Sequence, residues 1–373
     1  MSLKKYDAIV IGLGTMGSAA CMQLAQKGLN VLGLEKGEIV NDRSSHSGYT
    51  RLIRKAYFEH PDYVPLLERS YALWKNLEAS LNEQLFFKTG IAYFGHDTGP
   101  LLSGVQRSSS LYNIPVTHLE GNSFRPDIFR LPGKMNLLFE EDAGFLDVSR
   151  SIKGMCKMAR SSGAQLRANV EVIEWKQMRD KFELSTSEGT FISDYLVVCA
   201  GAFTSDLLPQ MKPQLSVTRQ LLTWADMETD EMPCWVIEDE EQVGIYYGFP
   251  AYSSGYRGMK IAHHIRGESI QPNQFMNFDS RNEMEKINEV LKKYFKRSGK
   301  VQLVAPCMYT YSPDDDFIVD FLPGANEKMI IAAGFSGHGF KFAPVVGEIV
   351  SDLVVNGISS QPADFLSFNR FIS

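Results

Sequence analysis

A glycine-rich segment near the N-terminus constrains the fold more than any other feature of the 373-residue chain. The run Gly12-Leu-Gly-Thr-Met-Gly17 follows residues 6–11, a β-branched apolar stretch typical of a buried strand. Residues 18–27 are rich in Ala, Leu, Gln and Met, which favour helix, and residues 29–34 predict a second strand. The order of strand, tight turn, helix and strand predicts a βαβ unit at the start of an α/β fold.

Each glycine of this turn has a distinct physical role. Gly12 allows the tight turn, Gly14 lets the backbone approach a pyrophosphate, and Gly17 allows close packing of helix on strand. The helix N-terminus offers free N–H groups to phosphates. Glu35, at the end of the second strand, can accept hydrogen bonds from ribose hydroxyls and would repel a 2′-phosphate. The segment predicts a dinucleotide site other than NADP, and the motif alone does not separate NAD from FAD.

Composition excludes several other classes of protein. The net charge of −6 argues against a nucleic-acid binder, which usually carries a basic excess. The five cysteines are scattered without CxxC spacing, so neither a disulfide framework nor a metal site is predicted. The uncharged run between Asp7 and Lys27 resembles an export signal, but its glycines and polar residues fit the βαβ unit better. We expect no membrane segment and a cytoplasmic location.

The remaining chain predicts two interleaved domains. Strand-like runs at 195–201 and 329–334 and a helix at 345–355 extend the Rossmann-like domain, whereas the run 244–249 and a charged helix at 281–295 belong elsewhere. We expect a two-domain α/β (α+β) architecture, in which a mixed-sheet substrate domain interrupts the Rossmann-like dinucleotide domain. The expected dinucleotide domain comprises residues 1–87, 145–215 and 307–373, and the expected substrate domain comprises 88–144 and 216–306.

Four local motifs occur beyond the glycine turn. They are Ser44-Ser-His-Ser-Gly-Tyr-Thr-Arg-Leu-Ile-Arg54, Tyr246-Tyr-Gly-Phe-Pro250, Cys307-Met-Tyr-Thr310 and Ala333-Gly-Phe-Ser-Gly-His-Gly-Phe-Lys-Phe342. With the N-terminal fingerprint, they make the chain resemble, nearly end to end, the monomeric sarcosine oxidase and N-methyltryptophan oxidase family. This family of FAD-dependent amine oxidases includes peroxisomal pipecolate/sarcosine oxidase.

The resemblance implies that FAD is linked covalently to Cys307, because a cysteine at this position carries the flavin in the family. Read without its neighbours, Cys307 would be an ordinary buried and inert thiol. Arg54 and Lys341 match the pair that holds the substrate carboxylate, for which a guanidinium is well suited. Lys260 matches the lysine that promotes reduction of O₂ by stabilising negative charge.

The resemblance also implies roles for other positions. Arg51 matches an arginine beside the flavin, and Tyr247, His264 and Tyr309 match residues of the substrate pocket; all four, with Lys260, form the expected catalytic group. The fingerprint and the resemblance together assign the following residues to cofactor binding: Gly12, Gly14, Thr15, Met16, Gly17, Glu35, Lys36, Ser45, His46, Arg51, Leu52, Val170, Ala200, Gly201, Phe203, Cys307, Met308, Gly337, His338, Gly339, Phe340 and Lys341.

The chain departs from the family in the segment that leads to Arg51. The family pattern His-His-Gly-Asp-Thr-Arg reads His46-Ser-Gly-Tyr-Thr-Arg51 here. Ser47 replaces an imidazole near the flavin, and Tyr49 replaces an aspartate at the edge of the site. The departure bears on the flavin's potential and on activity toward sarcosine itself more than on the class of reaction.

The resemblance implies an oxidase of secondary amino acids, such as sarcosine or another N-methyl amino acid. A hydride equivalent would pass from the amine to flavin N5, the imine would hydrolyse, and O₂ would be reduced to H₂O₂. An oxidase of cyclic imino acids such as pipecolate, a dehydrogenase with another electron acceptor, and a non-catalytic flavoprotein remain alternatives. The expected partners are a small amino acid and O₂, and the expected state is a monomer.

Overall fold

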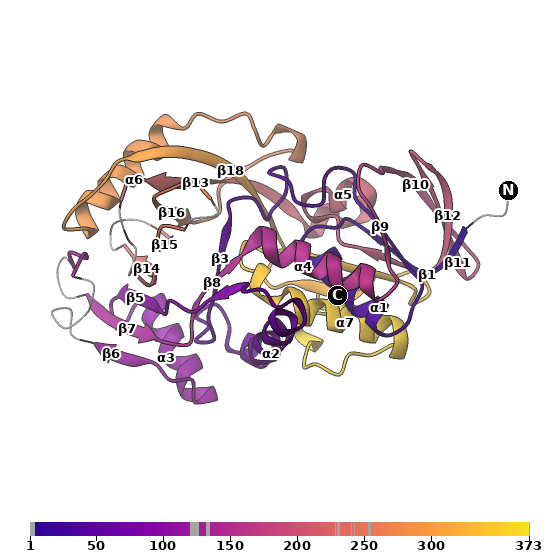
Figure 1. Ribbon diagram of the computed structural model, residues 1–373, viewed down its shortest axis with the longest axis horizontal. Helices are drawn as coiled ribbons and strands as arrows, with labels where there is room; N and C mark the ends of the chain where they lie inside the picture. The colour runs from indigo at the N-terminus through magenta and orange to yellow at the C-terminus, as the bar shows by residue number, and fades with distance from the viewer. Residues whose placement is uncertain are drawn as a thin grey trace.

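The structure is a computed structural model, and it describes residues 4–119, 127–131, 135–227, 229, 232–239, 241, 243–252 and 255–372. Two large sheets lie toward opposite ends of the long axis of the molecule, and the strands β3 and β8 lie between them (Figure 1). Within the described residues, no helix combines the length and the apolar composition that crossing a bilayer requires.

The N-terminal βαβ unit forms the centre of an eight-stranded sheet. Strand β1 pairs in parallel with β2 on one side and with β12 on the other. The strand order is β10-β11-β12-β1-β2-β9, and β20 joins β12 and carries β19. The strands are β1 (Lys4–Ile11), β2 (Val31–Leu34), β9 (Gln165–Arg167), β10 (Val172–Met178), β11 (Lys181–Thr186), β12 (Gly189–Val198), β19 (Ile318–Phe321) and β20 (Met329–Ala333).

Alternate residues of β1 face two different cores. Ala8 and Val10 join the core that includes helix α1, whereas Ile9 and Ile11 join the core on the opposite face of the sheet. On the first face, α1 packs against both α4 and α7 (Figure 1). The helices are α1 (Thr15–Gln26), α2 (Val64–Leu81), α3 (Pro100–Tyr112), α4 (Val148–Ser161), α5 (Thr204–Leu207), α6 (Arg281–Tyr294) and α7 (Ala343–Asn356).

A nine-stranded sheet forms the second layer. Its order is β17-β13-β16-β15-β14-β5-β7-β6, with β18 on β13, and the bridging sheet has the order β3-β8-β4. The strands are β3 (Thr50–Ile53), β4 (Phe86–Phe87), β5 (Ile91–Gly95), β6 (Thr117–Leu119), β7 (Asn136–Glu140), β8 (Gly144–Asp147), β13 (Ser216–Ala225), β14 (Cys234–Glu238), β15 (Ile245–Phe249), β16 (Met259–His264), β17 (Glu268–Ser269) and β18 (Val301–Tyr311).

Short 3₁₀ helices connect several of these elements. They are η1 (Pro61–Tyr63), η2 (Gly201–Phe203), η3 (Pro209–Gln214), η4 (Pro272–Gln274), η5 (Phe340–Phe342), η6 (Asp364–Leu366) and η7 (Phe368–Phe371). Three of them, η2, η4 and η5, contribute residues to the wall of the cavity described below.

The expected α/β fold class is confirmed by this arrangement of parallel and antiparallel sheets. The strand expected at 195–201 is the second half of a longer strand, because β12 already begins at Gly189 and ends at Val198. The first half of β12 pairs with β11, and its last residues pair with β20. These two strands therefore follow one another along the side of β12 that β1 does not occupy. The division into two interleaved domains remains a proposal, and β18 runs across its expected boundary between 306 and 307.

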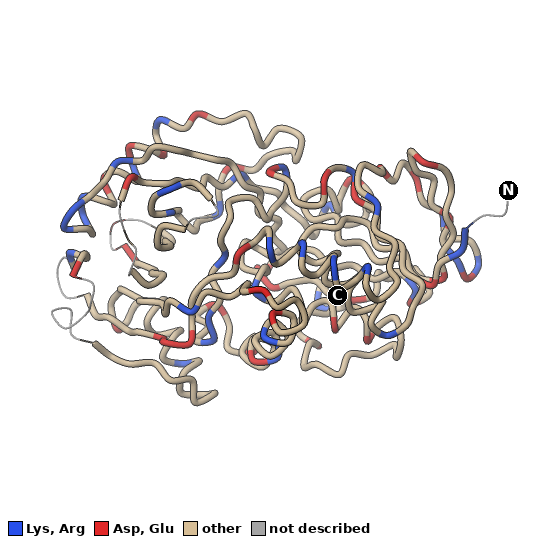
Figure 2. The backbone as a smooth tube through the Cα atoms, in the orientation of Figure 1, with Lys and Arg blue, Asp and Glu red and all other residues tan. Residues whose placement is uncertain are grey.

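Charged residues of both signs are spread along the chain. Lys and Arg residues alternate with Asp and Glu residues toward both ends of the molecule in the view of Figure 2. This distribution agrees with the modest net charge of −6.

Candidate active site

A cavity of about 920 Å³ lies where the carboxyl ends of β1 and β2 meet the second layer. Its volume is within the usual range for cofactor and small-molecule sites. One wall comes from the glycine turn after β1, a second from the turn after β12, and a third from the segment 334–340. In α/β folds of this kind, ligands bind at the carboxyl ends of the parallel strands, because the loops that follow the strands diverge there and leave a crevice.

Helix α1 points its N-terminus at this cavity. Gly14 is the N-cap residue, and no side chain caps the first turn of the helix. Free N–H groups and the positive end of the helix dipole are therefore available to an anion. Gly14, Thr15 and Met16 all line the cavity, as the fingerprint predicts for a phosphate-binding turn.

Glu35 closes the turn from the end of β2. One carboxylate oxygen accepts a hydrogen bond from the N–H of Leu13 at 2.8 Å, and the other accepts from Gly37 at 3.2 Å. Burial raises the pKa of Glu35, and these backbone donors oppose that shift. The carboxylate lines the cavity with lone pairs to spare, which suits recognition of ribose hydroxyls.

At two positions of the site, only glycine fits, because a side chain would overlap neighbouring atoms. A Cβ atom on Gly17 would lie 1.7 Å from the carbonyl oxygen of Gly12, so helix and strand could not approach as they do. Across the cavity, Gly337 has a φ of +82°, and a Cβ there would lie 2.3 Å from the ring of Tyr309. Gly17 thus sets how closely the helix approaches the strand, and Gly337 keeps its part of the cavity wall made of backbone.

Two buried polar atoms in the wall test whether a dinucleotide fits. Nε2 of His46 and Oγ1 of Thr310 are buried and have no hydrogen-bond partner among the described residues. Burial, with the charge of Arg51, lowers the pKa of His46 to about 3, so its imidazole is neutral. Buried polar groups are rarely left unsatisfied in native proteins, so these atoms fit the polar groups of a bound cofactor. With the helix N-terminus and Glu35, the donor set suits FAD.

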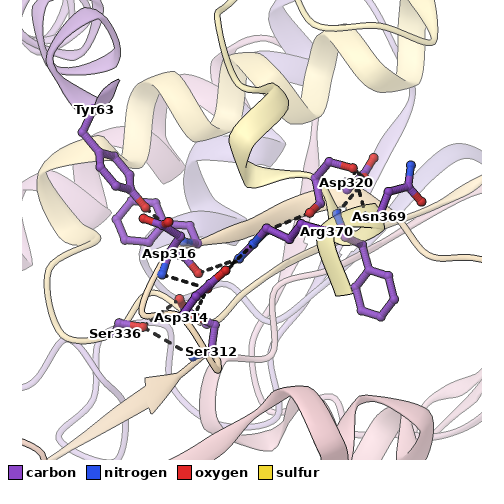
Figure 3. Close-up of polar contacts among 12 residues, drawn as sticks. Tyr63, Ser312, Asp314, Asp316, Asp320, Ser336, Asn369 and Arg370 are labelled. Atoms are coloured by element: carbon purple, nitrogen blue, oxygen red, sulfur yellow. Dashed lines mark hydrogen bonds and ion pairs between the residues drawn. The ribbon is translucent and has the colours of Figure 1, made fainter. Parts of the chain in front are cut away.

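The glycine-rich turn 334–339 is held from behind by polar contacts with the C-terminal segment (Figure 3). Ser336 adopts a φ of 46°, and its hydroxyl accepts a hydrogen bond from the N–H of Ser312 at 3.4 Å. Ser312 in turn donates to Asp314, whose carboxylate is bound by Arg370 at 2.8 Å. This chain of contacts ties residues near the C-terminus to a wall of the cavity.

Cys307 lies on β18 beside the cavity, not in its wall. The residue is fully buried, and its sulfur lies 3.5 Å from the carbonyl oxygen of Ser45 and 3.8 Å from Nη2 of Arg51. Both Ser45 and Arg51 line the cavity. The sulfur therefore contacts two residues of the wall, although Cys307 itself does not line it.

Lys260 is buried on β16 and is held by two backbone carbonyls. Its Nζ donates to Gly48 at 2.7 Å and to Thr50 at 2.9 Å, on either side of Tyr49. Tyr49 has a φ of 62°, an uncommon conformation for a residue other than glycine, which turns both carbonyls toward the amine. Burial, followed by the charge of Arg51, lowers the pKa of Lys260 well below its usual value.

The two replaced family positions lie in this same segment. The hydroxyl of Ser47 donates to the carbonyl oxygen of Pro306 at 3.3 Å, which ties the segment to β18 immediately before Cys307. The ring of Tyr49 makes an edge-to-face contact with Trp224, at a centroid distance of 5.8 Å. Tyr49 therefore contacts the second sheet, and the residue as a whole is 40% exposed.

Arg54 follows β3 and is almost completely buried. Its Nη2 lies 2.6 Å from each carboxylate oxygen of Glu59, and its guanidinium lies over the ring of Phe58. Burial alone would raise the pKa of Glu59, but the charges of Arg54 and its neighbours lower the pKa to about 2. The pair is therefore ionised, and Arg54 is bound by a carboxylate of the chain itself.

Lys341 lies close to this pair. Its carbonyl oxygen accepts hydrogen bonds from Ser70 and Trp74 of α2, which fix the backbone, and its Nζ donates to the carbonyl oxygen of His338 at 2.6 Å. Burial and the charge of Arg54 lower the pKa of Lys341 to about 7. His338 lies 2.5 Å from the hydroxyl of Tyr57, and burial lowers its pKa to about 3.

Three aromatic residues lie near the cations of the site. Arg51 influences the pKa of Tyr247 and Tyr309, and Lys341 and Arg54 influence that of His264. The hydroxyls of Tyr247 and Tyr309 are 3.3 Å apart, and the ring of His264 packs against Tyr309 at a centroid distance of 5.7 Å. Burial raises the pKa of both tyrosines and lowers that of His264, so all three are neutral near pH 7. They form an uncharged surface beside charged groups.

The structure brings most of the expected cofactor residues to one cavity. The expected residues in its wall are Gly12, Gly14, Thr15, Met16, Glu35, Lys36, Ser45, His46, Arg51, Val170, Ala200, Gly201, Phe203, Met308, Gly337, Gly339 and Phe340, together with Tyr309. Gly17, Leu52, Cys307, His338 and Lys341 lie outside the wall, and Lys341 belongs with Arg54.

Sequence reasoning missed part of the wall. The segment Pro272–Met276 lines the cavity from the second layer, yet it carries no motif that could have placed it there. Arg219 holds this segment by donating to the carbonyl oxygens of Gln274 and Phe275. Thr310 also lines the cavity, and its place at the end of the Cys307–Thr310 motif is a signal from which this could have been predicted.

Comparisons with known proteins agree with this geometry. A family profile described as "FAD dependent oxidoreductase" (DAO) matches residues 7–353. Monomeric sarcosine oxidase from Streptomyces avermitilis is 33% identical over 96% of this chain and 95% of its own length. N-methyl-L-tryptophan oxidase from Yersinia pestis is 33% identical over 93% of this chain and 94% of its own length.

A solved structure supports the same fold. NikD, described as an unusual amino acid oxidase essential for nikkomycin biosynthesis, superposes with a TM-score of 0.86 and 23% identity, over 98% of this chain and 97% of NikD. At this identity, the likeness establishes the fold alone. With the family profile and the two relatives, the chain belongs to the FAD-dependent oxidoreductases, in the family of the monomeric sarcosine and N-methyl-L-tryptophan oxidases.

Proposed function

We propose that the protein is an FAD-dependent oxidase of secondary amino acids, with sarcosine or another N-methyl amino acid as the substrate class. The observation that carries the proposal is the buried group of Arg54, Lys341 and Glu59 beside the cofactor cavity. Nη2 of Arg54 contacts both oxygens of the Glu59 carboxylate at 2.6 Å, so this buried guanidinium already binds a carboxylate. The names of the relatives support the same substrate class.

The proposed role of the cations is to bind and orient the substrate. The substrate carboxylate would take the place of Glu59 on Arg54, and the ammonium of Lys341 would add a second attraction. A carboxylate fixed at one end leaves the amine end to the uncharged surface of Tyr247, Tyr309 and His264. Neutral surroundings favour the neutral amine, whose lone pair is needed for oxidation.

When bound, FAD supplies the electron acceptor for oxidation of the substrate C–N bond, and its reduced form is reoxidised by O₂ with release of H₂O₂. We propose that Lys260 stabilises the negative charge that develops on oxygen, because its amine is buried and fixed by two carbonyls. We further propose that Cys307 holds the cofactor covalently. The adjacent guanidinium of Arg51 supports that role.

The proposal is tested by anaerobic mixing of the purified holoenzyme with a panel of N-methyl amino acids and cyclic imino acids. We expect at least one N-methyl amino acid to bleach the visible flavin absorbance, and the amide of the same compound to react far more slowly. If no member of the panel bleaches the flavin, the proposed activity is wrong.

The same panel separates the remaining alternatives. Stoichiometric peroxide in air supports an oxidase, whereas bleaching without peroxide indicates a dehydrogenase with another electron acceptor. Bleaching only by pipecolate-type substrates indicates a cyclic imino acid oxidase. We also propose a monomeric, cytoplasmic protein, and the relatives named monomeric sarcosine oxidase support the monomer.

A further inference from the structure

Glu140 is a fully buried carboxylate that the sequence analysis did not single out. It ends β7, and its side chain has no exposed surface. One carboxylate oxygen accepts a hydrogen bond from the N–H of Lys55 at 2.6 Å. The other accepts from the N–H of Ala56 at 3.2 Å and from the hydroxyl of Tyr93 at 2.8 Å. All three donors are uncharged groups, so this carboxylate is held differently from one in a buried ion pair.

The two backbone donors belong to the turn that directly follows Arg54. Residues 54–56 are in neither a helix nor a strand, so their N–H groups need acceptors from elsewhere in the fold. Glu140 is 84 residues away from Ala56 in sequence, and it supplies the acceptors for the N–H groups of Lys55 and Ala56. The turn therefore takes its shape from a side chain on another sheet.

The same turn holds the guanidinium. Nη1 of Arg54 donates to the carbonyl oxygen of Ala56 at 3.1 Å, while Nη2 carries the contact with Glu59. An incoming carboxylate that displaces Glu59 would leave the contact with Ala56 in place. The hydrogen bond to Ala56 would then hold the guanidinium in its orientation during binding. This hydrogen bond depends on the backbone conformation that Glu140 fixes.

Arg54 and Glu140 also interact electrostatically. Burial raises the pKa of Glu140, and the charge of Arg54 is among the influences that oppose this shift. Glu140 thus acts on Arg54 through the backbone and through its field, without touching it directly.

We propose that Glu140 is a positioning residue for substrate carboxylate binding: by fixing the turn at Lys55 and Ala56, it holds Arg54 in the geometry that receives the carboxylate. This inference rests on the proposed function, because it requires Arg54 to be the carboxylate receptor. It assigns Glu140 no contact with the substrate or the cofactor.

The test uses methoxyacetate, in which an ether oxygen replaces the amine of N-methylglycine, so the compound binds without being oxidised. Its neutral partner is methoxyacetamide. Each is titrated into the oxidised holoenzyme and followed by the visible absorbance of the flavin. In Glu140→Gln, we expect the Kd of methoxyacetate to rise about tenfold, the effect of weakening one hydrogen bond to a charged group. The Kd of methoxyacetamide should stay unchanged.

Two further variants control for a general loss of stability. Asp352, on α7, is a second buried acid. It accepts hydrogen bonds from the backbone N–H and the hydroxyl of Ser360. Asp352→Asn should leave the Kd of both compounds unchanged. Tyr93→Phe removes one donor to Glu140 and keeps the carboxylate, so it should weaken methoxyacetate binding in the same direction but less. This variant keeps the test valid if Glu140→Gln does not fold.

A double-mutant cycle with Arg54→Lys identifies the residue through which Glu140 acts. If the action runs through the guanidinium, Glu140→Gln should change the Kd less than about twofold in the Arg54→Lys background. Equal effects on acid and amide, or fully additive effects with Arg54→Lys, would overturn the proposed role of Glu140.

The failure of the proposed function gives a different result. If wild-type protein binds methoxyacetate no better than methoxyacetamide, Arg54 is not a carboxylate receptor, and both proposals are wrong. If the wild type prefers the acid and Glu140→Gln and Tyr93→Phe keep that preference in full, only the role of Glu140 is wrong.

Discussion

Both carboxylate oxygens of Glu59 lie 2.6 Å from Nη2 of Arg54. The guanidinium that we assign to the substrate is thus paired with an acid five residues away. In the proposed function a substrate carboxylate displaces Glu59 from Arg54, so Glu59 would compete with the ligand.

Replacing Glu59 should therefore tighten the binding of carboxylates. In Glu59→Gln, we expect the Kd of methoxyacetate to fall roughly tenfold, because the competing charge is gone. The ligand-free variant should melt at a lower temperature, since it leaves a buried guanidinium without its counter-charge. Methoxyacetate should raise the melting temperature of the variant by more than it raises that of the wild type. Absorbance titration and thermal melting measure both effects.

A matched control is Glu348→Gln, which breaks the ion pair with Arg69 away from this site. It should leave the Kd of methoxyacetate unchanged. Weaker ligand binding in Glu59→Gln would mean that Glu59 helps to hold the carboxylate instead of competing with it.

Ligand affinity should depend on pH through Lys341. Its pKa is lowered to about 7 by burial and by Arg54, so the ammonium is lost as the pH rises through this value. Methoxyacetate has no titrating amine, and the pKa of His338 is about 3, so neither contributes near neutral pH. We expect the affinity to be highest below pH 7 and to fall above it. Lys341→Met should bind weakly with no change through this range, as titrations at several pH values would show.

Cys307 should carry the flavin. Cys307→Ser should fold and bind FAD non-covalently, because the cavity wall does not include Cys307. After acid precipitation, wild-type protein should keep its yellow colour in the pellet, whereas the variant should release it to the supernatant. Cys199→Ser, at a cysteine that lines the cavity, is the control and should keep the colour in the pellet. Colour released from the wild type would contradict a covalent link.

Lys260 should act on oxygen and not on the amine. In Lys260→Met, the reoxidation of reduced flavin by O₂ should slow about 100-fold, because the amine that would stabilise the developing negative oxygen is lost. Anaerobic reduction by the substrate should change less than about threefold. Stopped-flow absorbance measures the two steps separately. Lys286→Met is the control, since Lys286 binds His263 on the same strand and should affect neither step. Equal slowing of both steps in Lys260→Met would assign the residue a structural role.

Much of the fold could be predicted because the signals are local. Gly12 and Gly17 stand at the spacing that a strand–turn–helix requires, and chain neighbours largely determine whether a strand or a helix begins. The helix expected at 281–295 is observed as α6, ending at Tyr294. The motif around Cys307 likewise pointed to a family that the comparisons confirm.

Other features depend on partners far away in sequence. β12 is one strand because β11 and β20 pair with its two halves, which no local pattern reveals. The segment Pro272–Met276 reaches the cavity only because the tertiary structure brings this part of the chain beside the first sheet.

The sequence by itself determined the βαβ unit, the family and the residue types available for chemistry. Only the tertiary structure decided which of these groups lie together: Glu59 on Arg54, Arg51 beside Cys307, and Glu140 on the turn that follows Arg54. The physical reason is range. Backbone propensity acts over a few residues, whereas burial and Coulomb interaction depend on distance in space, which chain folding sets and sequence separation does not.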